Sequence, residues 1–292
     1  MSNVVWPEGK TFGLCLTHDV DRIKKTFQVI THFLRDRRFY HFTSVLQDPN
    51  PYWAFDKIIE IERRYDVKST FFFLNETKKH KIFRPSTYQL TFGRYNIFDP
   101  DVVKMIRKLD KQGWEIGLHG SYDSYKNIKL LKKEKKDLEK ILKKPIMGVR
   151  QHYINLRIPM TWNNQKKIGL KYDSTYGTRK KIGFPKNIYL PFKPFHDQFL
   201  VIPFTIMDDF LFKPEISTEQ AWDICLNIID EAEKNGSLVT VIWHTERFND
   251  NEFPGQMMIY ERIIEECMKR NAFIGPCKDF YNLFSEDNKH GL

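Results

Sequence analysis

Strand-like apolar runs alternate with helical patterns along nearly the whole chain, and this alternation restricts the fold more than any other feature. Runs with the apolar, β-branched or aromatic character of buried strands lie at residues 12–16, 68–74, 114–118, 146–149, 170–173, 200–207 and 238–243. Helical patterns lie at residues 23–34, 56–65, 99–112, 128–143, 158–168, 217–235 and 256–270. Such alternation is typical of an α/β protein with a parallel sheet, open or closed. We find no linker and no repeat, and we therefore expect one domain over residues 1–292.

Charge and cysteine usage narrow the class of protein. The net charge of +10 lies partly in Lys-rich runs such as residues 132–136, which fit solvated helix faces. A basic surface also attracts anionic substrates or membranes, but the chain has no nucleic-acid-binding signature, so we expect no nucleic-acid partner. The four cysteines form no CxxC pair, which argues against a structural zinc site and a disulfide framework. Residues 1–7 lack a signal-peptide pattern and no run could cross a bilayer, so we expect a cytoplasmic protein without a transmembrane segment.

Reactive side chains follow five of the predicted strands. They are Asp19 and Asp21, His119, Arg150, Asp208, and His244. In α/β folds the carboxyl ends of parallel strands lie along one edge of the sheet, where ligands bind. Asp19 and Asp21 are two residues apart, so on an extended segment their side chains share one face. The repeated placement of reactive groups at strand ends predicts a functional site at this edge.

Three of the candidate residues could bind a metal. His119 and Asp123 are four residues apart, so their side chains would face the same side if the segment turns helically. Together with Asp21 they would supply one nitrogen and two oxygen ligands. Three protein ligands and an open water position are typical of a catalytic metal site. Alternatively, Asp123 only caps a helix that begins near Tyr125.

These residues resemble the motifs of a known family, the polysaccharide deacetylases of the NodB-homology class, or carbohydrate esterase family 4. The resemblance extends from about residue 11 to residue 283. Residues 17–21, Thr-His-Asp-Val-Asp, are similar to the family's paired aspartates. Residues 119–123 are similar to its His-(Ser/Thr)-x-x-His motif, with Asp123 in place of the last His. Arg150 and residues 241–244, which end in His244, resemble its last two motifs.

The resemblance implies a distorted (β/α)7 barrel and a metal-dependent hydrolase that removes an N- or O-acetyl group from a sugar. Asp19 would be the general base, Arg150 would pair with it, and His244 would be the general acid. Asp21 and His119, with Asp123 in place of the missing His, would hold a divalent metal. Zinc is the first expectation, with nickel, manganese or iron as alternatives. The Asp123 replacement leaves open a weak metal site or a metal-free reaction.

Several neighbouring residues have two interpretations each. Trp243 either belongs to the core or stacks on the sugar, and we assign it to substrate binding together with Asp208. Asp208 or Asp173 could instead orient His244, and His18 could be either a metal ligand or a hydrogen-bond donor to one. Residues that could reach or line the pocket are His152, Glu246, Arg247 and Asn249.

The expected substrate is an acetamido sugar linked to a nucleotide or a lipid, made for an O-antigen or a capsule. The basic charge would suit a diphosphate-bearing substrate. Two alternatives keep the fold: a metal-independent hydrolase of another C–N bond, such as a cyclic amide, and a non-catalytic sugar-binding protein on a degenerate deacetylase scaffold. The irregular stretch at residues 76–98 is a candidate lid. The sequence does not predict the oligomeric state.

Overall fold

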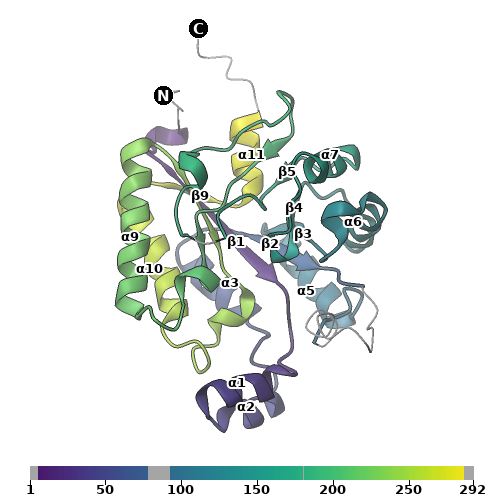
Figure 1. The fold of residues 1–292 in the computed structure, drawn as a ribbon, viewed down its shortest axis with the longest axis vertical. Helices are drawn as coiled ribbons and strands as arrows, with labels where there is room; N and C mark the ends of the chain where they lie inside the picture. The colour runs from purple at the N-terminus through teal and green to yellow at the C-terminus, as the bar shows by residue number, and fades with distance from the viewer. Residues whose placement is uncertain (1–5, 78–92, 180, 286–292) are drawn as a thin grey trace.

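A single curled sheet of parallel strands forms the centre of the molecule (Figure 1). The computed structural model describes residues 6–77, 93–179 and 181–285. Along the sheet the strands follow the order β6-β5-β4-β3-β2-β1-β8-β7, and β9 pairs with β1. Their bounds are β1 Gly13–Val20, β2 Thr70–Leu74, β3 Glu115–Gly120, β4 Gly148–Gln151, β5 Tyr172–Asp173, β6 Leu200–Val201, β7 Ile206–Met207, β8 Leu238–Ile242 and β9 Phe273–Gly275.

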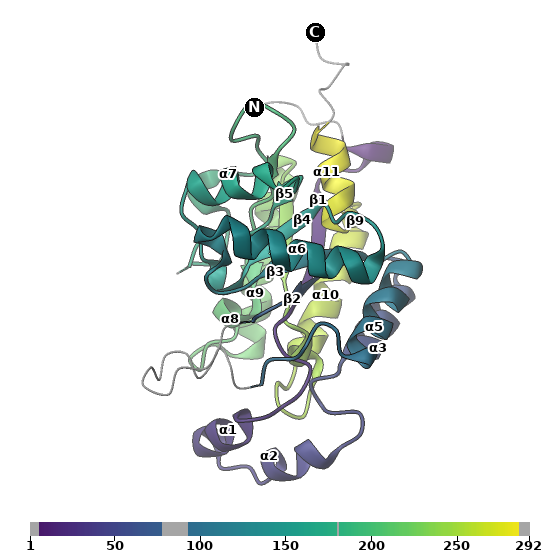
Figure 2. The same ribbon diagram turned by 90° about the vertical axis from the view of Figure 1, so that its right-hand side faces the viewer.

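Helices surround this sheet and connect its strands (Figures 1 and 2). Their bounds are α1 Gln28–Asp36, α2 Tyr40–Thr43, α3 Phe55–Arg64, α5 Pro100–Lys111, α6 Ile128–Leu142, α7 Met160–Lys167, α8 Asp208–Leu211, α9 Thr218–Asn235, α10 Gln256–Lys269 and α11 Cys277–Ser285. The curled parallel sheet with outer helices confirms the predicted distorted (β/α)7 barrel. The short strands β6 and β7 are the two edges of the described sheet. None of the described helices combines the length and the apolar character needed to cross a membrane.

The central strand β1 has different partners on its two faces. Leu14, Leu16 and Val20 belong to the main core, which the sheet shares with residues of helices such as α3, α9 and α10. Cys15 belongs to a second core inside the curl, where residues of α11 pack. Successive side chains of a strand point to opposite faces, so Thr17 and Asp19 face the same side as Cys15. Even-numbered positions of β1 therefore support the helices, and odd-numbered ones line the interior.

Local signals at the helix ends match the sequence expectations. The Asp99 side chain accepts a hydrogen bond from the backbone N–H of Asp101 at 3.1 Å, directly before Pro100 in the first turn of α5. Ser217 and Gln220 form a capping box at the start of α9, and Gly236 ends that helix with φ +60°. These caps fix where the helices begin and end, and so where the neighbouring strands start.

The elements differ from the prediction in several places. Strand β1 runs on to Val20, because the polar residues 17–19 pair with β2 as regular strand residues. The run at residues 200–207 contains two short strands, β6 and β7, since Pro203 interrupts it. The first helix starts at Gln28 rather than residue 23, and α2, β9 and α11 were not predicted. Most of the candidate lid, residues 78–92, lies outside the described residues.

Candidate active site

The predicted strand ends meet at one pocket of about 460 Å³. Its lining includes Asp19, Asp21, His119, His152, His244 and Glu246. These residues come from β1, from β3 and from the segments that follow β1, β4 and β8. The structure therefore brings together residues as far apart in the sequence as Asp19 and Glu246, as the parallel order of the strands requires.

Asp19 and Arg150 form a buried ion pair at the floor of the pocket, as predicted. Arg150 Nη1 donates to Asp19 Oδ1 at 2.8 Å and to Thr17 Oγ1 at 2.7 Å. Its Nε and Nη2 donate to the backbone oxygen and the hydroxyl of Ser174, and its guanidinium lies 4.5 Å from the centre of the Phe72 ring. Because each guanidinium nitrogen has a hydrogen-bond acceptor, Arg150 is held in place and fixes the position of the Asp19 carboxylate. Asp19 Oδ2 stays directed toward His119 Nε2, at 3.8 Å.

His119 and Asp21 face each other across the pocket floor. His119 Nδ1 lies 2.9 Å from the backbone oxygen of Arg150 and donates to it, so the other ring nitrogen carries the lone pair. That nitrogen, Nε2, lies 3.0 Å from Asp21 Oδ1. Burial alone would lower the pKa of His119, but the Asp19 and Asp21 carboxylates raise it above its ordinary value. Two lone pairs at this separation need a proton or a cation between them.

His152 is the third donor of this group. Its Nε2 lies 3.1 Å from Asp21 Oδ2, and its ring centre lies 5.1 Å from that of His119. Burial raises the pKa of Asp21, but the two imidazoles lower it to well below its usual range. Asp21, His119 and His152 thus place one oxygen and two nitrogen donors within 4.8 Å of one another. A carboxylate and two imidazoles are a donor set that zinc and similar divalent metals accept, so the residues fit a metal.

Asp123, the predicted third ligand, is not part of this group. The strand β3 ends at Gly120, and Asp123 stands at the start of the 3-10 helix Ser124–Lys126. Its carboxylate forms an ion pair with Lys126 at 3.1 Å and does not line the pocket. The prediction of Asp123 as a ligand is therefore corrected: the structure places His152 with the other two candidate ligands. The signal was present in the sequence, because His152 follows Arg150 at the same two-residue spacing that relates Asp21 to Asp19.

His244 is held by Asp208 at the opposite wall. His244 Nδ1 donates to Asp208 Oδ1 at 2.7 Å, and the His244 backbone N–H donates to Asp208 Oδ2 at 2.6 Å. His244 Nε2 then points into the pocket, 3.7 Å from Asp21 Oδ2. Burial lowers the pKa of His244, but Asp208, Asp209 and Asp21 raise it well above its ordinary value. Asp208 itself is fully buried, so its assignment to substrate binding is corrected: it orients His244.

The segment after His244 contributes one more acidic group to the pocket. Burial and the nearby Asp21 raise the pKa of Glu246 to about 7, although His244 and Arg247 lower it. Arg247 pairs with Asp209 and approaches Asp208 at 3.9 Å, so it supports the His244 side of the pocket from behind. Asn249 contacts Tyr40 and is not a pocket residue.

Trp243 and His18 both lie on the outer side of the sheet. Trp243 is fully buried in the main core, where its ring packs against Phe212 and Tyr260. Neighbouring residues on an extended strand face opposite sides, so Trp243 cannot share the pocket with His244. The prediction that Trp243 binds substrate is therefore corrected: Trp243 is a core residue. His18 is likewise neither a ligand nor a donor to one, because its ring nitrogens contact the backbone oxygen of Trp243 and the Glu62 carboxylate.

Asp173 does not reach His244. Its carboxylate accepts hydrogen bonds from Gln165 at 2.7 Å and from the hydroxyl of Thr175 at 2.6 Å, and it also contacts Trp162. Burial raises the pKa of Asp173, although these hydrogen bonds lower it. Asp173 therefore joins α7 to the segment after β5. Of the two aspartates that the sequence offered for orienting His244, it is Asp208 that does so.

Comparison with protein-family models gives no match, and comparison with curated proteins gives none. Solved structures do match. One is described as a probable polysaccharide deacetylase from Pseudomonas aeruginosa PAO1, with a TM-score of 0.66, 14% identity, and coverage of 98% of this chain and 95% of that one. Another is described as a polysaccharide deacetylase from Mycobacterium smegmatis, with a TM-score of 0.63, 17% identity, and coverage of 96% and 92%. The chain has the fold of the polysaccharide deacetylases.

The deacetylase fold also includes proteins with other activities. An allantoinase matches with a TM-score of 0.64 at 15% identity, over 98% of this chain and 94% of that one. A protein described as a carbohydrate esterase family 4 pseudoenzyme matches with a TM-score of 0.52 at 11% identity, over 94% and 68%. These similarities show the fold, so the reaction must be argued from the residues of the pocket.

Proposed function

We propose that this protein is a metal-dependent hydrolase that removes the acetyl group from an acetamido sugar. The observation that carries the proposal is the arrangement of three separate units around one pocket. Asp19 with Arg150 forms one unit, the donors Asp21, His119 and His152 form the second, and His244 with Asp208 forms the third. A base, a metal site and an acid are the parts that hydrolysis of an unactivated amide needs.

The donor group would hold a divalent metal, with zinc as the first candidate. Such an ion would lower the pKa of a water and polarise the acetyl carbonyl. The backbone oxygen of Arg150 fixes the ring orientation of His119 by accepting its Nδ1 proton. Fixing the tautomer in this way makes Nε2 available as a ligand.

Asp19 is the general base of the proposal. Its Oδ1 is held by Arg150, which leaves Oδ2 as the atom that can take a proton from the attacking water. The ion pair stabilises the charged carboxylate and prevents it from rotating. Proton transfer to a positioned carboxylate contributes about 10²- to 10⁴-fold to the rate.

His244 is the general acid. Its raised pKa keeps the imidazole protonated near neutral pH, and Asp208 accepts the Nδ1 proton. The proton on Nε2 faces the pocket and can pass to the departing amine. Without that proton the sugar amine would have to leave as the strongly basic anion RNH⁻. The proton transfer is therefore essential to breaking the C–N bond.

The pocket suits a single sugar that carries an anionic group. Two cationic side chains, Arg22 and Arg179, belong to the pocket lining. Together with the net charge of +10 they support an acetamido sugar linked through phosphate to a nucleotide or a lipid. A cytoplasmic location and a role in making an O-antigen or capsule remain part of this proposal.

One alternative has a specific observation in its favour. The allantoinase that shares the fold supports hydrolysis of another C–N bond, such as one in a cyclic amide, by the same base and acid. In that case a proton rather than a metal would lie between His119 Nε2 and Asp21 Oδ1. The pseudoenzyme neighbour favours a third outcome, sugar binding without turnover.

Release of acetate tests the proposal. The zinc-loaded protein is incubated with a nucleotide-linked acetamido sugar, a polyprenyl-diphosphate-linked one, and chitooligosaccharides. We expect acetate from a linked sugar, with kcat lower by about 10²-fold or more in Asp19→Asn and His244→Asn while substrate binding persists. Asp123→Asn is the matched control, because its carboxylate lies outside the pocket. Unchanged kcat in Asp19→Asn, or hydrolysis of a cyclic amide alone, would contradict the proposal.

A further inference from the structure

A helical excursion, residues 22–52, projects from the barrel directly after the active-site strand. It contains α1 and α2 and begins one residue after Asp21. Both views show α1 and α2 beyond the carboxyl end of β1, apart from the other helices (Figures 1 and 2). The pocket opens on this same edge of the sheet, and Arg22 belongs both to the excursion and to the pocket lining.

Helix α1 has its polar face inward and its apolar face outward. On the inner face Gln28 is buried and His32 is partly buried. On the outer face Ile30 and Leu34, four residues apart, are 60% and 56% exposed. A surface helix of a globular protein normally has the opposite orientation, with its apolar stripe against the core. The reversed orientation therefore needs both a polar support inside and an apolar partner outside.

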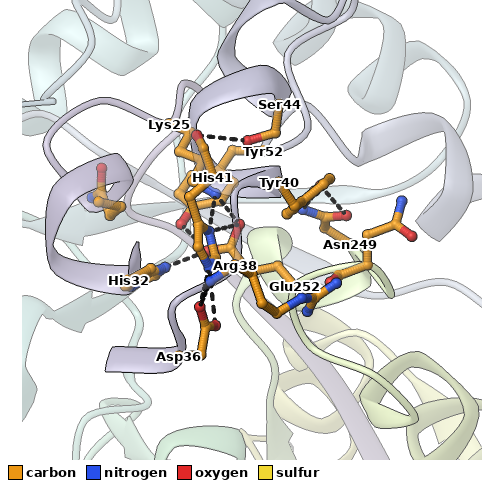
Figure 3. Close-up of polar contacts among 12 residues, drawn as sticks. Lys25, His32, Asp36, Arg38, Tyr40, His41, Ser44, Tyr52, Asn249 and Glu252 are labelled. Carbon is orange, nitrogen blue, oxygen red and sulfur yellow. Dashed lines mark hydrogen bonds and ion pairs between the residues drawn. The ribbon is translucent and has the colours of Figure 1, made fainter. Parts of the chain in front are cut away.

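The polar support is a buried network centred on Glu252 (Figure 3). Glu252 accepts hydrogen bonds from Lys25 Nζ at 2.6 Å, from His32 Nδ1 at 2.5 Å and from the Tyr52 hydroxyl at 2.7 Å. Lys25 Nζ also lies 2.7 Å from His41 Nδ1. His32, His41 and Glu252 are close enough together to bind a metal, but the Lys25 ammonium already provides the cation between them. The network fixes the excursion with its apolar face turned away from the barrel.

The outward face of the excursion carries a group of exposed apolar side chains, which we call the outer patch. Its aromatic part is a cluster in which the Phe33 ring centre lies 5.6 Å from that of Phe39 and 4.9 Å from that of Phe42. Phe39 is 75% exposed and Leu46 is 84% exposed. The outer patch consists of Ile30, Phe33, Leu34, Phe39, Phe42 and Leu46. Large apolar side chains gathered at one exposed place are typical of an interaction surface.

The charges around the outer patch are nearly all positive. Among the charged residues classed as exposed between positions 22 and 50, the basic ones are Lys24, Arg35, Arg37 and Arg38, and the acidic one is Asp48. Asp36 is partly buried, and its carboxylate is hydrogen-bonded to His41 and Arg35. An apolar patch with a basic rim matches the interface of a bilayer that contains acidic lipids. There the headgroups are anionic and the acyl chains beneath them are apolar.

We propose that the outer patch docks the protein on an anionic lipid surface, so that the pocket acts on a sugar attached to a membrane lipid. This inference rests on the proposed function and selects the lipid-linked member of its substrate class. The apolar side chains would enter the headgroup region, and the arginines would contact lipid phosphates. A second copy of the chain is a poorer partner, because a two-fold contact through this patch would bring the basic rims of both copies together.

Co-sedimentation with vesicles tests the docking directly. The full chain is mixed with vesicles of phosphatidylcholine alone and with vesicles that also contain phosphatidylglycerol. We expect binding to the anionic vesicles that weakens with salt. Phe39→Ser with Leu46→Ser, and separately Arg35→Gln with Arg37→Gln, should each lower the partition coefficient about tenfold or more. Met258→Ser with Met268→Ser is the matched control, since these residues of α10 are 48% and 46% exposed.

The outcomes separate this proposal from the proposed function. Binding does not require turnover, so Asp19→Asn should bind anionic vesicles as the wild type does, whether or not the protein is a deacetylase. Absence of wild-type binding, or equal binding by the patch variants and the methionine control, would overturn the docking proposal. So would a change from dimer to monomer in the patch variants, measured by analytical ultracentrifugation, without a change in vesicle binding.

Discussion

His244 depends on Asp208 for both its position and its charge. Asp208 receives the imidazole Nδ1–H and the backbone N–H of the same residue, an arrangement that fixes the ring completely. Burial lowers the pKa of His244, and Asp208 is the largest contribution that raises it. Asp208 therefore contributes most to keeping the proposed acid protonated, with Asp209 and Asp21 acting in the same direction.

Asp208→Asn should move the alkaline limb of the kcat–pH profile to lower pH. Loss of the carboxylate lowers the pKa of His244, so the imidazole loses its proton at a lower pH. The protein then lacks its proposed general acid from that pH upward. A shift of about one pH unit or more is expected. Asp209→Asn serves as the control, because Asp209 raises the same pKa less strongly and should give a smaller shift. An unmoved alkaline limb in Asp208→Asn would show that His244 is not the acid.

Trp243→Phe should lower stability and leave substrate binding unchanged. The ring fills a core site beside Phe212 and Tyr260, so the smaller side chain leaves a cavity. We expect a loss of about 1 to 3 kcal/mol in the free energy of unfolding, measured by denaturant titration. A KM that rises severalfold at unchanged stability would instead restore the sugar-binding interpretation.

For single residues, the sequence predicts the position of a side chain well when the periodicity of a strand determines which way that side chain faces. Asp19, Asp21, His119 and His244 lie at strand ends and line the pocket as expected, and Arg150 pairs with Asp19 beneath it. Trp243 was misassigned because its neighbour His244 was considered without the alternation of faces. Asp123 was misassigned because the motif resemblance placed a ligand there, whereas β3 ends at Gly120 and the chain turns away. His152 could have been found by applying the spacing of two residues to Arg150.

Among the elements, the excursion that carries α1 and α2 is attached mainly through polar contacts. Burial raises the pKa of Glu252, but His32, Lys25 and Tyr52 lower it from 4.5 to about 2. A carboxylate with a lowered pKa stabilises the folded state fully above its ordinary pKa and loses that contribution as pH falls. The attachment of the excursion should therefore weaken between about pH 4.5 and pH 2.

Glu252→Gln should detach the excursion at neutral pH. The substitution leaves the Lys25 ammonium buried without its carboxylate, which costs about 3 kcal/mol or more. Hydrogen exchange should accelerate in residues 22–52, and the acid-dependent loss of stability between pH 4.5 and pH 2 should shrink. Glu261→Gln is the matched control, because that carboxylate pairs with the half-exposed Arg64 and should cost less than about 1 kcal/mol. Equal exchange in both variants would contradict this account of the attachment.

Element by element, periodic segments with clear caps were predicted closely, as α5, α6 and α9 show. The excursion was not, because its helix has an inverted pattern that depends on Glu252, more than 200 residues away. The run at residues 200–207 was read as one strand because its apolar residues continue past Pro203. Long-range polar support of this kind leaves little local signal, whereas Pro203 was a local signal of the strand break.

For the whole molecule, the fold acts as a frame that brings three chemical units to one edge of the sheet. The three candidate metal donors come from β3 and from the segments after β1 and β4. A bound ion would therefore link parts of the chain that lie far apart in the sequence. The fold class follows from the alternation of strands and helices, but the donor set depends on where each strand stops. The assignment of His152 instead of Asp123 is therefore the claim that most needs measurement.

Zinc content per chain, measured by elemental analysis after loading and dialysis, tests that claim most directly. The account predicts about one equivalent in the wild type and in Asp123→Ala, and its loss in His152→Ala, His119→Ala and Asp21→Ala. Circular dichroism would verify that each variant is folded. Zinc retained in His152→Ala, or lost in Asp123→Ala, would contradict the site described by the structure.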